Sequence, residues 1–173
     1  NSITEEDPAG RLFTAKNEAD LIQNNKVRNA TFTIPAASFN SNDVKVQVHA
    51  EDLSGNISHS EVIPIKIDIT APTINVTYDL NNPSNGRYYN ATRTATVTVT
   101  ERNFDPSAVR FNITNTDGTQ PSISGWSHSA GAGVSDSATH TCTVTFAADG
   151  DYTFTLNTTD LAGNTSSYGR VDE

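Results

Sequence analysis

A five-residue turn sequence occurs twice in this chain, and the repeat around it limits the folds that the chain can adopt. Asp52-Leu53-Ser54-Gly55-Asn56 returns as Asp160-Leu161-Ala162-Gly163-Asn164, 108 positions later. The same offset aligns the alternating apolar residues before each turn, Val44, Val46 and Val48 with Tyr152, Phe154 and Leu156. Alternating apolar residues indicate a strand with one buried face, and self-similarity at a fixed offset indicates tandem domains. We therefore expect two related β-domains in a row.

Five runs between residues 74 and 156 alternate apolar residues with polar ones, mostly threonine. Their apolar members are Ile74, Val76 and Tyr78; Ala95, Val97 and Val99; Val109, Phe111 and Ile113; Cys142, Val144 and Phe146; and Tyr152, Phe154 and Leu156. A period of two is typical of antiparallel strands that bury one face. Turn sequences such as Asp117-Gly118 and Asp149-Gly150 separate the runs. Six or seven strands joined by such turns predict a β-sandwich.

The boundary between the two domains is expected near Pro72. Four alternating isoleucines end the first domain as a last strand, and Pro72 then restricts Ala71 to extended geometry. We assign residues 1–70 to a partial first domain made of late strands, and residues 71–173 to a second domain whose last strand is cut short. The joint between the two domains should be short, and Pro72 should make it stiff.

Charge and cysteine content exclude several classes of protein. The chain has 11 Lys and Arg against 20 Asp and Glu, a net charge of −9, so it offers no basic patch and no nucleic-acid partner is expected. Cys142 is the only cysteine; an intrachain disulfide is therefore impossible, and we expect Cys142 to be a small core residue. No apolar run is long enough to span a bilayer, so direct membrane insertion is not expected.

Several segments resemble the bacterial immunoglobulin-like repeat domains of large Gram-positive cell-surface and secreted proteins. They are Thr70-Ala71-Pro72, Glu101-Arg102-Asn103-Phe104-Asp105, Asp149-Gly150-Asp151-Tyr152 and Asp160-Leu161-Ala162-Gly163-Asn164. The resemblance implies an all-β fold of tandem immunoglobulin-like antiparallel β-sandwiches, the first incomplete. It places Phe154 and Val97 where immunoglobulin domains carry their paired cysteines, and Phe111 in the place of the core tryptophan. It also implies an extracellular location, secreted or attached to the cell wall of a Gram-positive bacterium.

The expected function is that of a non-catalytic stalk, spacer or adhesion module whose neighbours are further immunoglobulin-like domains of the parent protein. The alternatives are direct binding of a host glycan or host protein, including immunoglobulin, and service as an accessory domain of a secreted carbohydrate-active enzyme. None of the four histidines belongs to a recognisable nucleophile, base and acid set. No catalytic residue is therefore assigned, and the chain is not expected to be an enzyme.

Two aromatic groups are candidate ligand contacts. Trp126 and His128 lie in a Gly- and Ser-rich segment, where an exposed indole stacks on a sugar or anchors a protein partner. The alternative is that Trp126 plugs one end of the sandwich. Tyr88 and Tyr89, next to Asn85-Gly86-Arg87, form a second group with the same two interpretations.

No cofactor and no metal ligand are assigned, with a structural calcium ion as the alternative. Oxygen-bearing side chains of the kind that suits calcium are Glu101, Asn103, Asp105, Asp160 and Asn164. Asp and Asn are also the residues that a tight turn requires, because their side chains accept hydrogen bonds from nearby backbone amides.

Overall fold

The computed structural model describes residues 4–6, 12–14, 33–51 and 54–170. The chain divides into two compact units, Asn1–Asp68 and Ile69–Glu173, two residues before the boundary expected from Pro72. Regular structure in the described residues is β-strand, apart from the short 3-10 helices η2 (Ala36–Ser38) and η3 (Pro106–Ala108). The predicted all-β class is confirmed. No helix in this part of the chain is long and apolar enough to cross a membrane.

The first sheet of the second unit is antiparallel and has the order β10-β12-β8-β7. Its strands are β7 (Thr73–Tyr78), β8 (Arg93–Thr100), β10 (Ser122–Ile123) and β12 (Thr139–Phe146), and β11 (Ser127–His128) also pairs with β12. Threonines on β8 and β12 face one another across the pair, for example Thr98 opposite Thr141. The alternate residues of both strands are buried, so the sheet has one apolar and one polar face, as the period of two predicts.

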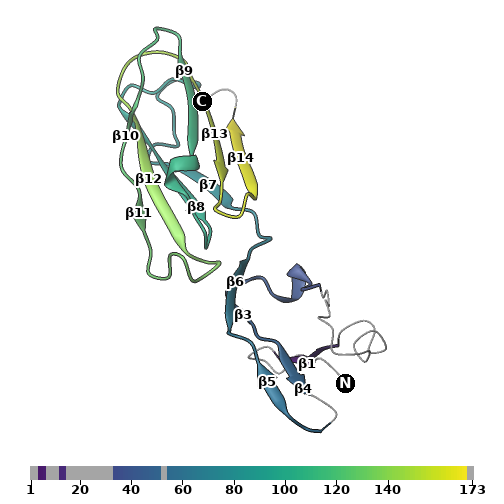
Figure 1. Cartoon of the computed structure of the whole chain (residues 1–173). Coiled ribbons are helices and arrows are strands. Elements are labelled where there is room, and N and C mark those ends of the chain that lie inside the picture. Colours follow the sequence, from purple (N-terminus) through teal and green to yellow (C-terminus); the bar gives the residue numbers. More distant parts are fainter. Residues whose placement is uncertain (1–3, 7–11, 15–32, 52–53, 171–173) are drawn as a thin grey trace. The chain divides into compact units, whose positions relative to one another are not determined.

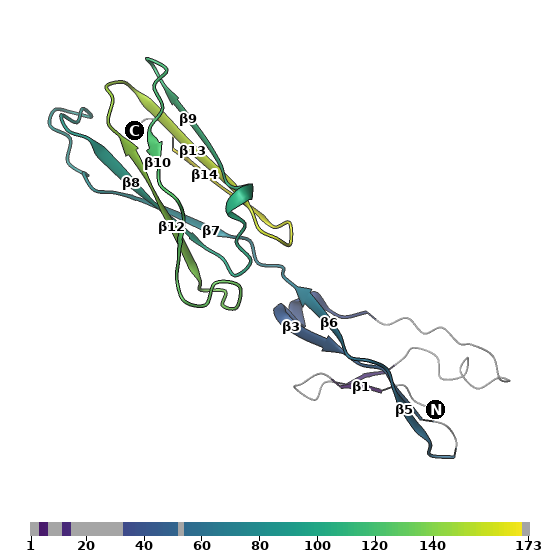
Figure 2. The ribbon, with the colours of Figure 1, turned by 60° about the vertical axis from the view of Figure 1, so that its left-hand side comes forward.

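The second sheet of this unit has the order β14-β13-β9 and covers the apolar face of the first. Its strands are β9 (Arg110–Asn115), β13 (Tyr152–Thr159) and β14 (Thr165–Arg170). Figures 1 and 2 show the two layers of this β-sandwich-like unit from two directions. The connection between Thr100 and Arg110 carries the chain from the first sheet to the second.

The space between the two sheets is filled by apolar side chains from both. Phe154 and Leu156 of β13 are 1% and 0% exposed, and Val97 of β8 is fully buried opposite them. Cys142 is 2% exposed, and burial raises the pKa of its thiol to about 11. The expectation that Cys142 is a core residue is confirmed. The buried cluster is Ala95, Val97, Val99, Val109, Ile113, Cys142, Val144, Phe154 and Leu156.

Strands β10 and β11 were not predicted from the sequence, which marks the stretch around Trp126 and His128 only as rich in Gly and Ser. Both strands have only two residues and pair with the outer edge of β12 on either side of Trp126. Between them, Ser124 accepts the Thr143 N–H through its side chain and donates its own N–H to the Thr143 carbonyl. Such an edge strand needs no alternating apolar residues, so it leaves no periodic signal in the sequence.

The described residues of the first unit form two antiparallel sheets. One has the order β2-β1-β4-β5, from β1 (Thr4–Glu6), β2 (Leu12–Thr14), β4 (His49–Glu51) and β5 (Ile57–His59). The other pairs β3 (Ser41–Val46) with β6 (Ile63–Ile67). Val44 and Val46 are buried, as the alternation predicts.

The strands that flank the repeated turn sequence pair in the same register in both units. Glu51 pairs with Ile57 across the first turn, and the equivalent positions Thr159 and Thr165 pair across the second. Gly55 and Gly163 both adopt positive φ angles, 84° and 93°. Residues 52 and 53 lie outside the described part of the chain. The strand before the turn differs, because β13 is continuous whereas β3 and β4 belong to different sheets.

Substitution of Gly150 by alanine should destabilise the second unit strongly. Gly150 has a φ of 140°, and a Cβ there would lie 1.8 Å from Oδ1 of Asn115. The Asn115 amide is held by hydrogen bonds to Asp117, Thr119 and the Asp149 carbonyl, so it is not free to move aside. We expect a loss of roughly 1–3 kcal/mol in the free energy of unfolding.

The measurement is urea unfolding followed by the fluorescence of Trp126, the only tryptophan in the chain. Gly118→Ala is the matched control, because Gly118 also has a positive φ but no atom within 4 Å of the added Cβ. Equal losses of unfolding free energy in the two variants would show that the clash with Asn115 does not contribute to the destabilisation.

Candidate functional sites

The segment that follows β8 buries three consecutive charged or polar residues. Glu101, Arg102 and Asn103 are 2%, 4% and 9% exposed. Oε1 of Glu101 accepts the Asn103 N–H at 2.8 Å, and Nη1 of Arg102 lies 2.9 Å from a carboxylate oxygen of the half-exposed Asp136. Buried charges require such partners because their desolvation is costly. The segment therefore holds the loop that contains Asp136 as well as its own turn.

Asp160 organises the repeated turn between β13 and β14. Its Oδ1 accepts the backbone N–H groups of Ala162 and Asn164 at 2.8 and 2.9 Å, and its Oδ2 accepts Nδ2 of Asn164 at 2.9 Å. The neighbouring Leu161 N–H donates to the Asn103 carbonyl at 2.9 Å. The turn and the segment after β8 are thus joined by a direct hydrogen bond, although they are far apart in the sequence.

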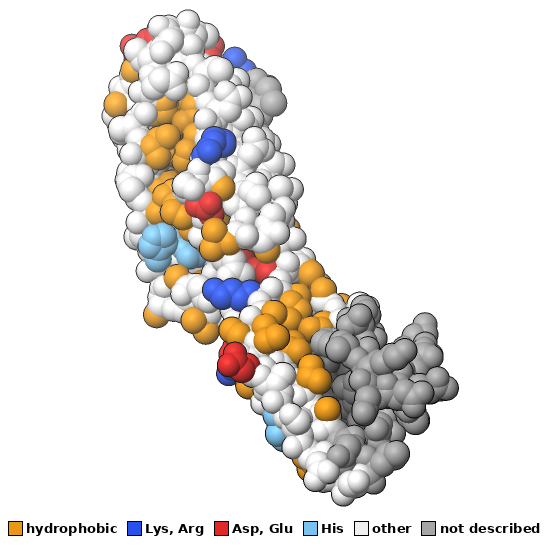
Figure 3. Space-filling view, in the orientation of Figure 1, with side chains coloured by type: hydrophobic (Ala, Val, Ile, Leu, Met, Phe, Trp, Pro, Cys, Tyr) orange, Lys and Arg blue, Asp and Glu red, His pale blue; other side chains and the backbone are white. Residues whose placement is uncertain are grey.

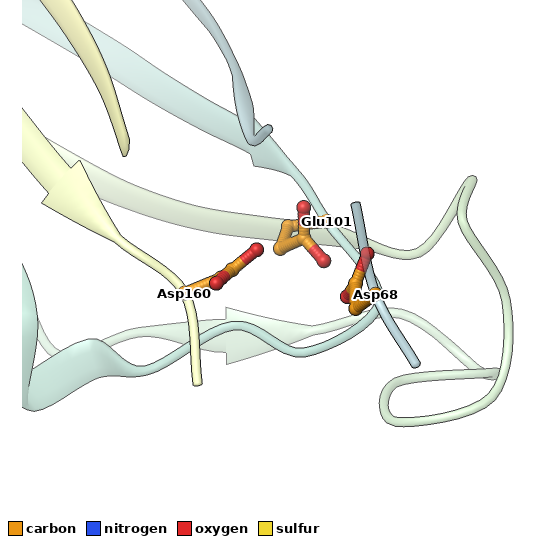
Figure 4. A group of neighbouring side chains, drawn as sticks. All are labelled: Asp68, Glu101 and Asp160. Atoms are coloured by element: carbon orange, nitrogen blue, oxygen red, sulfur yellow. The ribbon is translucent and has the colours of Figure 1, made fainter. Parts of the chain in front are cut away.

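Two carboxylates of the second unit lie close together next to this junction. One oxygen of Glu101 and one of Asp160 lie within 4.8 Å of each other. Figure 4 shows the Glu101 and Asp160 side chains turned toward one another. Oxygen ligands of this kind suit a hard cation, but Glu101 and Asp160 also accept backbone hydrogen bonds. The absence of a cofactor, with structural calcium as its alternative, stays a prediction.

Of the other calcium candidates, Asp105 serves a different purpose. Its Oδ1 accepts the N–H and the hydroxyl of Ser107 at 2.8 and 2.6 Å, which caps helix η3. Hydrogen bonds from Ser107 lower the pKa of the Asp105 carboxyl. The structure therefore brings together Glu101, Asn103, Asp160 and Asn164 but assigns Asp105 to the start of the next element.

Phe104 is the centre of an aromatic group that the sequence analysis did not recognise. Its ring stacks on His140 with centroids 4.3 Å apart and meets the edge of Trp126 at 4.8 Å. His128 lies 6.1 Å from the same ring, and Phe111 lies 6.4 Å from Trp126. Trp126 and His128 are two residues apart in a nearly extended segment, so both side chains face Phe104.

The two histidines of this group have defined protonation. His140 is 2% exposed, and its Nε2 lies 2.7 Å from the Glu101 carbonyl. A carbonyl only accepts, so Nε2 carries the proton and Nδ1 of neutral His140 accepts from Nδ1 of His128, 2.7 Å away. Desolvation by burial, with a smaller contribution from His128, lowers the pKa of His140, although the hydrogen bond to the Glu101 carbonyl acts in the opposite direction.

Trp126 is half-buried, so it has features both of a ligand contact and of a plug at the end of the sandwich. It packs against the core cluster beside Phe104 and Phe111, while His128 next to it is exposed. Figure 3 shows hydrophobic side chains gathered on the face of the second unit where β9, β10 and β12 lie, with histidine beside them. The assignment of Trp126 and His128 as ligand contacts stays a prediction.

The second aromatic group lies in the loop between β7 and β8. Tyr88 is 66% exposed, whereas Tyr89 is half-buried. The guanidinium of Arg93 lies 4.2 Å from the centre of the Tyr89 ring and 3.9 Å from that of Tyr78, an arrangement in which the cation is attracted to both π faces. Tyr89 is therefore occupied by an internal contact, and Tyr88 is left as the accessible ring.

The two aromatic groups occupy different regions of the second unit. Tyr88 and Tyr89 follow the end of β7 and precede the start of β8, where Tyr78 pairs with Ala95. The Phe104 group lies toward the other end of β8, where Val99 pairs with His140. The structure does not bring the four predicted contact residues into one site.

The missed residues left only weak signals in the sequence. His140 shares the inward phase of Cys142, which correctly places it inside, but nothing in the sequence links it to Phe104.

No protein-family model and no curated protein matches this chain.

Replacement of Asp160 by asparagine should destabilise the second unit by about 1–3 kcal/mol, because an amide cannot make the same three charge-assisted hydrogen bonds. The measurement is urea unfolding by Trp126 fluorescence in the presence of a chelator, so that bound cations contribute nothing. Asp151→Asn, at an exposed position, should change stability by less than about 0.5 kcal/mol. A stable Asp160→Asn variant would contradict the structural assignment of this carboxylate.

The stability of the second unit should fall as the pH is lowered through about 6.5, the ordinary pKa of histidine. The folded pKa of His140 is depressed, so the unfolded chain binds a proton that the folded chain does not, and acid favours unfolding. His140→Gln should flatten the dependence between pH 7 and pH 5, whereas His59→Gln in the first unit should not. The readout is the free energy of unfolding at each pH, and identical slopes in all three proteins would refute the prediction.

Proposed function

We propose that this chain is a non-catalytic immunoglobulin-like module of an extracellular bacterial surface protein, acting as a stalk, spacer or adhesion module. The strand order of the second unit is the observation that carries the proposal. In constant-type immunoglobulin domains, strands A, B, E and D form one sheet and strands C, F and G the other. Across the first sheet, β7, β8, β12 and the β10–β11 pair take the places of A, B, E and D, and across the second sheet β9, β13 and β14 take those of C, F and G.

A hydrogen bond at the start of β13 supports the same proposal. The Tyr152 hydroxyl donates to the Ala148 carbonyl at 3.0 Å, and Phe154, two residues later, is buried in the core. Immunoglobulin-like domains carry a tyrosine corner at this place, two residues before the second core cysteine. Phe154 here takes the place of that cysteine, and Phe111 stacks on it with centroids 6.1 Å apart.

The strand register that the two units share around the repeated turn sequence supports a role as one module in a tandem array. Two units that share a turn and its strand pairing are typical of arrays in which similar modules follow one another. In such an array the partners are the neighbouring domains, and the Pro72 joint limits the freedom of the chain between them. The proposal assigns no catalytic residue and no cofactor, and places the parent protein outside a Gram-positive cell.

A second candidate function is direct recognition of a host glycan or host protein. The specific observation in its favour is Tyr88, an aromatic ring that is 66% exposed and follows the same turn as Tyr89, which contacts the Arg93 guanidinium. Aromatic rings of this kind are frequent anchors in binding sites. The half-buried Trp126 and the exposed His128 would form a separate contact.

A binding array of mucin glycans and host proteins distinguishes the two functions. We expect the chain to give no saturable binding, because a spacer needs none. The array includes Tyr88→Ala, which removes an exposed ring, and Trp126→Ala, whose fold is checked by circular dichroism. Saturable binding that either variant abolishes, with the fold intact, would replace the spacer proposal with recognition and would locate the site.

A further inference from the structure

The turn between β7 and β8 presents an Asn-Gly peptide bond in an open setting. Asn85, Gly86 and Arg87 are exposed, and Gly86 adopts a φ of 58° with no atom within 4 Å of the place where a Cβ would stand. The turn is closed by hydrogen bonds that use only the backbone of Asn85, with the Tyr88 N–H donating to its carbonyl at 2.8 Å. Asn85 is followed by the one residue type that leaves its neighbouring peptide nitrogen unshielded.

The two groups that react in asparagine deamidation are both accessible here. Among the described residues, neither the side-chain amide of Asn85 nor the backbone N–H of Gly86 takes part in a hydrogen bond. Asparagine is chemically labile when a backbone nitrogen can reach its side-chain carbonyl carbon. We propose that Asn85 is a self-modification site that converts spontaneously, through a succinimide, to aspartate and isoaspartate.

The reaction needs only water. The deprotonated backbone nitrogen of Gly86 attacks Cγ of Asn85, the Cγ–Nδ2 bond breaks, and ammonia leaves with the proton that the backbone nitrogen lost. Water then opens the five-membered ring. Cleavage of the bond from nitrogen to Cγ gives aspartate, and cleavage of the bond to the α-carbonyl carbon gives isoaspartate. No oxidant, reductant or cofactor is consumed, and the chain gains one carboxylate.

Other residues of similar type are better protected. Asn90 is exposed in the same loop, but its Oδ1 accepts the Ser84 hydroxyl at 2.6 Å and Ala91 follows it. Asp117 precedes Gly118, but its Oδ1 accepts hydrogen bonds from Asn115 and from the Thr119 N–H. These bonds keep the group as a carboxylate, which is a poor electrophile. Asn85 is therefore singled out by its contacts as well as by its sequence.

The modification would alter the turn that presents Tyr88. Isoaspartate adds one methylene to the main chain between Asn85 and Gly86, so the hydrogen bond from the Tyr88 N–H can no longer keep its geometry. The new carboxylate stands two positions before Arg87 in the sequence and adds to a net charge that is already −9. The inference does not depend on the proposed function, since the chemistry requires no partner.

Peptide mapping by mass spectrometry tests the proposal on the full chain after incubation in mildly alkaline buffer. Conversion of the amide to the acid should occur at Asn85 first, roughly tenfold or more faster than at Asn90, because a Cβ on the following residue hinders attack. The isoaspartate product is detected separately as a substrate for enzymatic methylation by an isoaspartate methyltransferase.

The controls separate the site from general ageing of the chain. Asn85→Gln keeps the amide and should abolish the early acidic product, whereas Asn90→Gln should leave it unchanged. Retention of the Asn85 amide in the folded chain, under conditions in which the urea-unfolded chain converts, would overturn the proposal. Conversion at Asn90 as fast as at Asn85 would overturn it as well.

Discussion

The second unit depends on five consecutive residues, 101–105, that carry the chain from one sheet to the other. Glu101 supports its own turn and its carbonyl fixes His140, Arg102 pairs with Asp136, and Phe104 covers the histidine from the other side. Buried polar groups without partners are costly, so each of these contacts both stabilises the segment and fixes the loop that it reaches. The same segment continues into the cap of η3 and then into β9. The two sheets are therefore joined by polar contacts at their edge as well as by apolar packing between them.

The apolar core of the second unit is packed without a disulfide. Phe154 and Val97 lie at its centre, and both are buried almost completely. Cys142, the only cysteine, is also buried, and the raised pKa of its thiol leaves it nearly unreactive near neutral pH. Stability then comes from burial and from the fixed corners, such as the one at Tyr152. The stability of this core therefore does not depend on a cross-link that a reducing agent would break.

A serial β-module and a recognition module make different demands on this surface. The spacer function needs the repeated hairpin, the apolar core and the corners, all of which lie in the interior or at fixed turns. Recognition needs accessible side chains, and these are concentrated at Tyr88 and beside Trp126, in separate places. Tyr88 sits on the turn that contains Asn85, so an exposed aromatic ring and the proposed modification site share one loop. Chemical change at that loop would leave the core untouched.

The sequence by itself determined the all-β class, the five principal strands, the inward positions of Cys142 and His140, and the repeated hairpin. Each of these depends on contacts along the chain or on a period of two, which side-chain type records directly. Only the tertiary structure decided which polar residues meet. It placed Glu101 beside Asp160, set Phe104 between His140 and Trp126, and paired His128 with β12. These contacts join residues that are distant in the chain, and an edge strand pairs through its backbone, so neither leaves a periodic trace in the sequence.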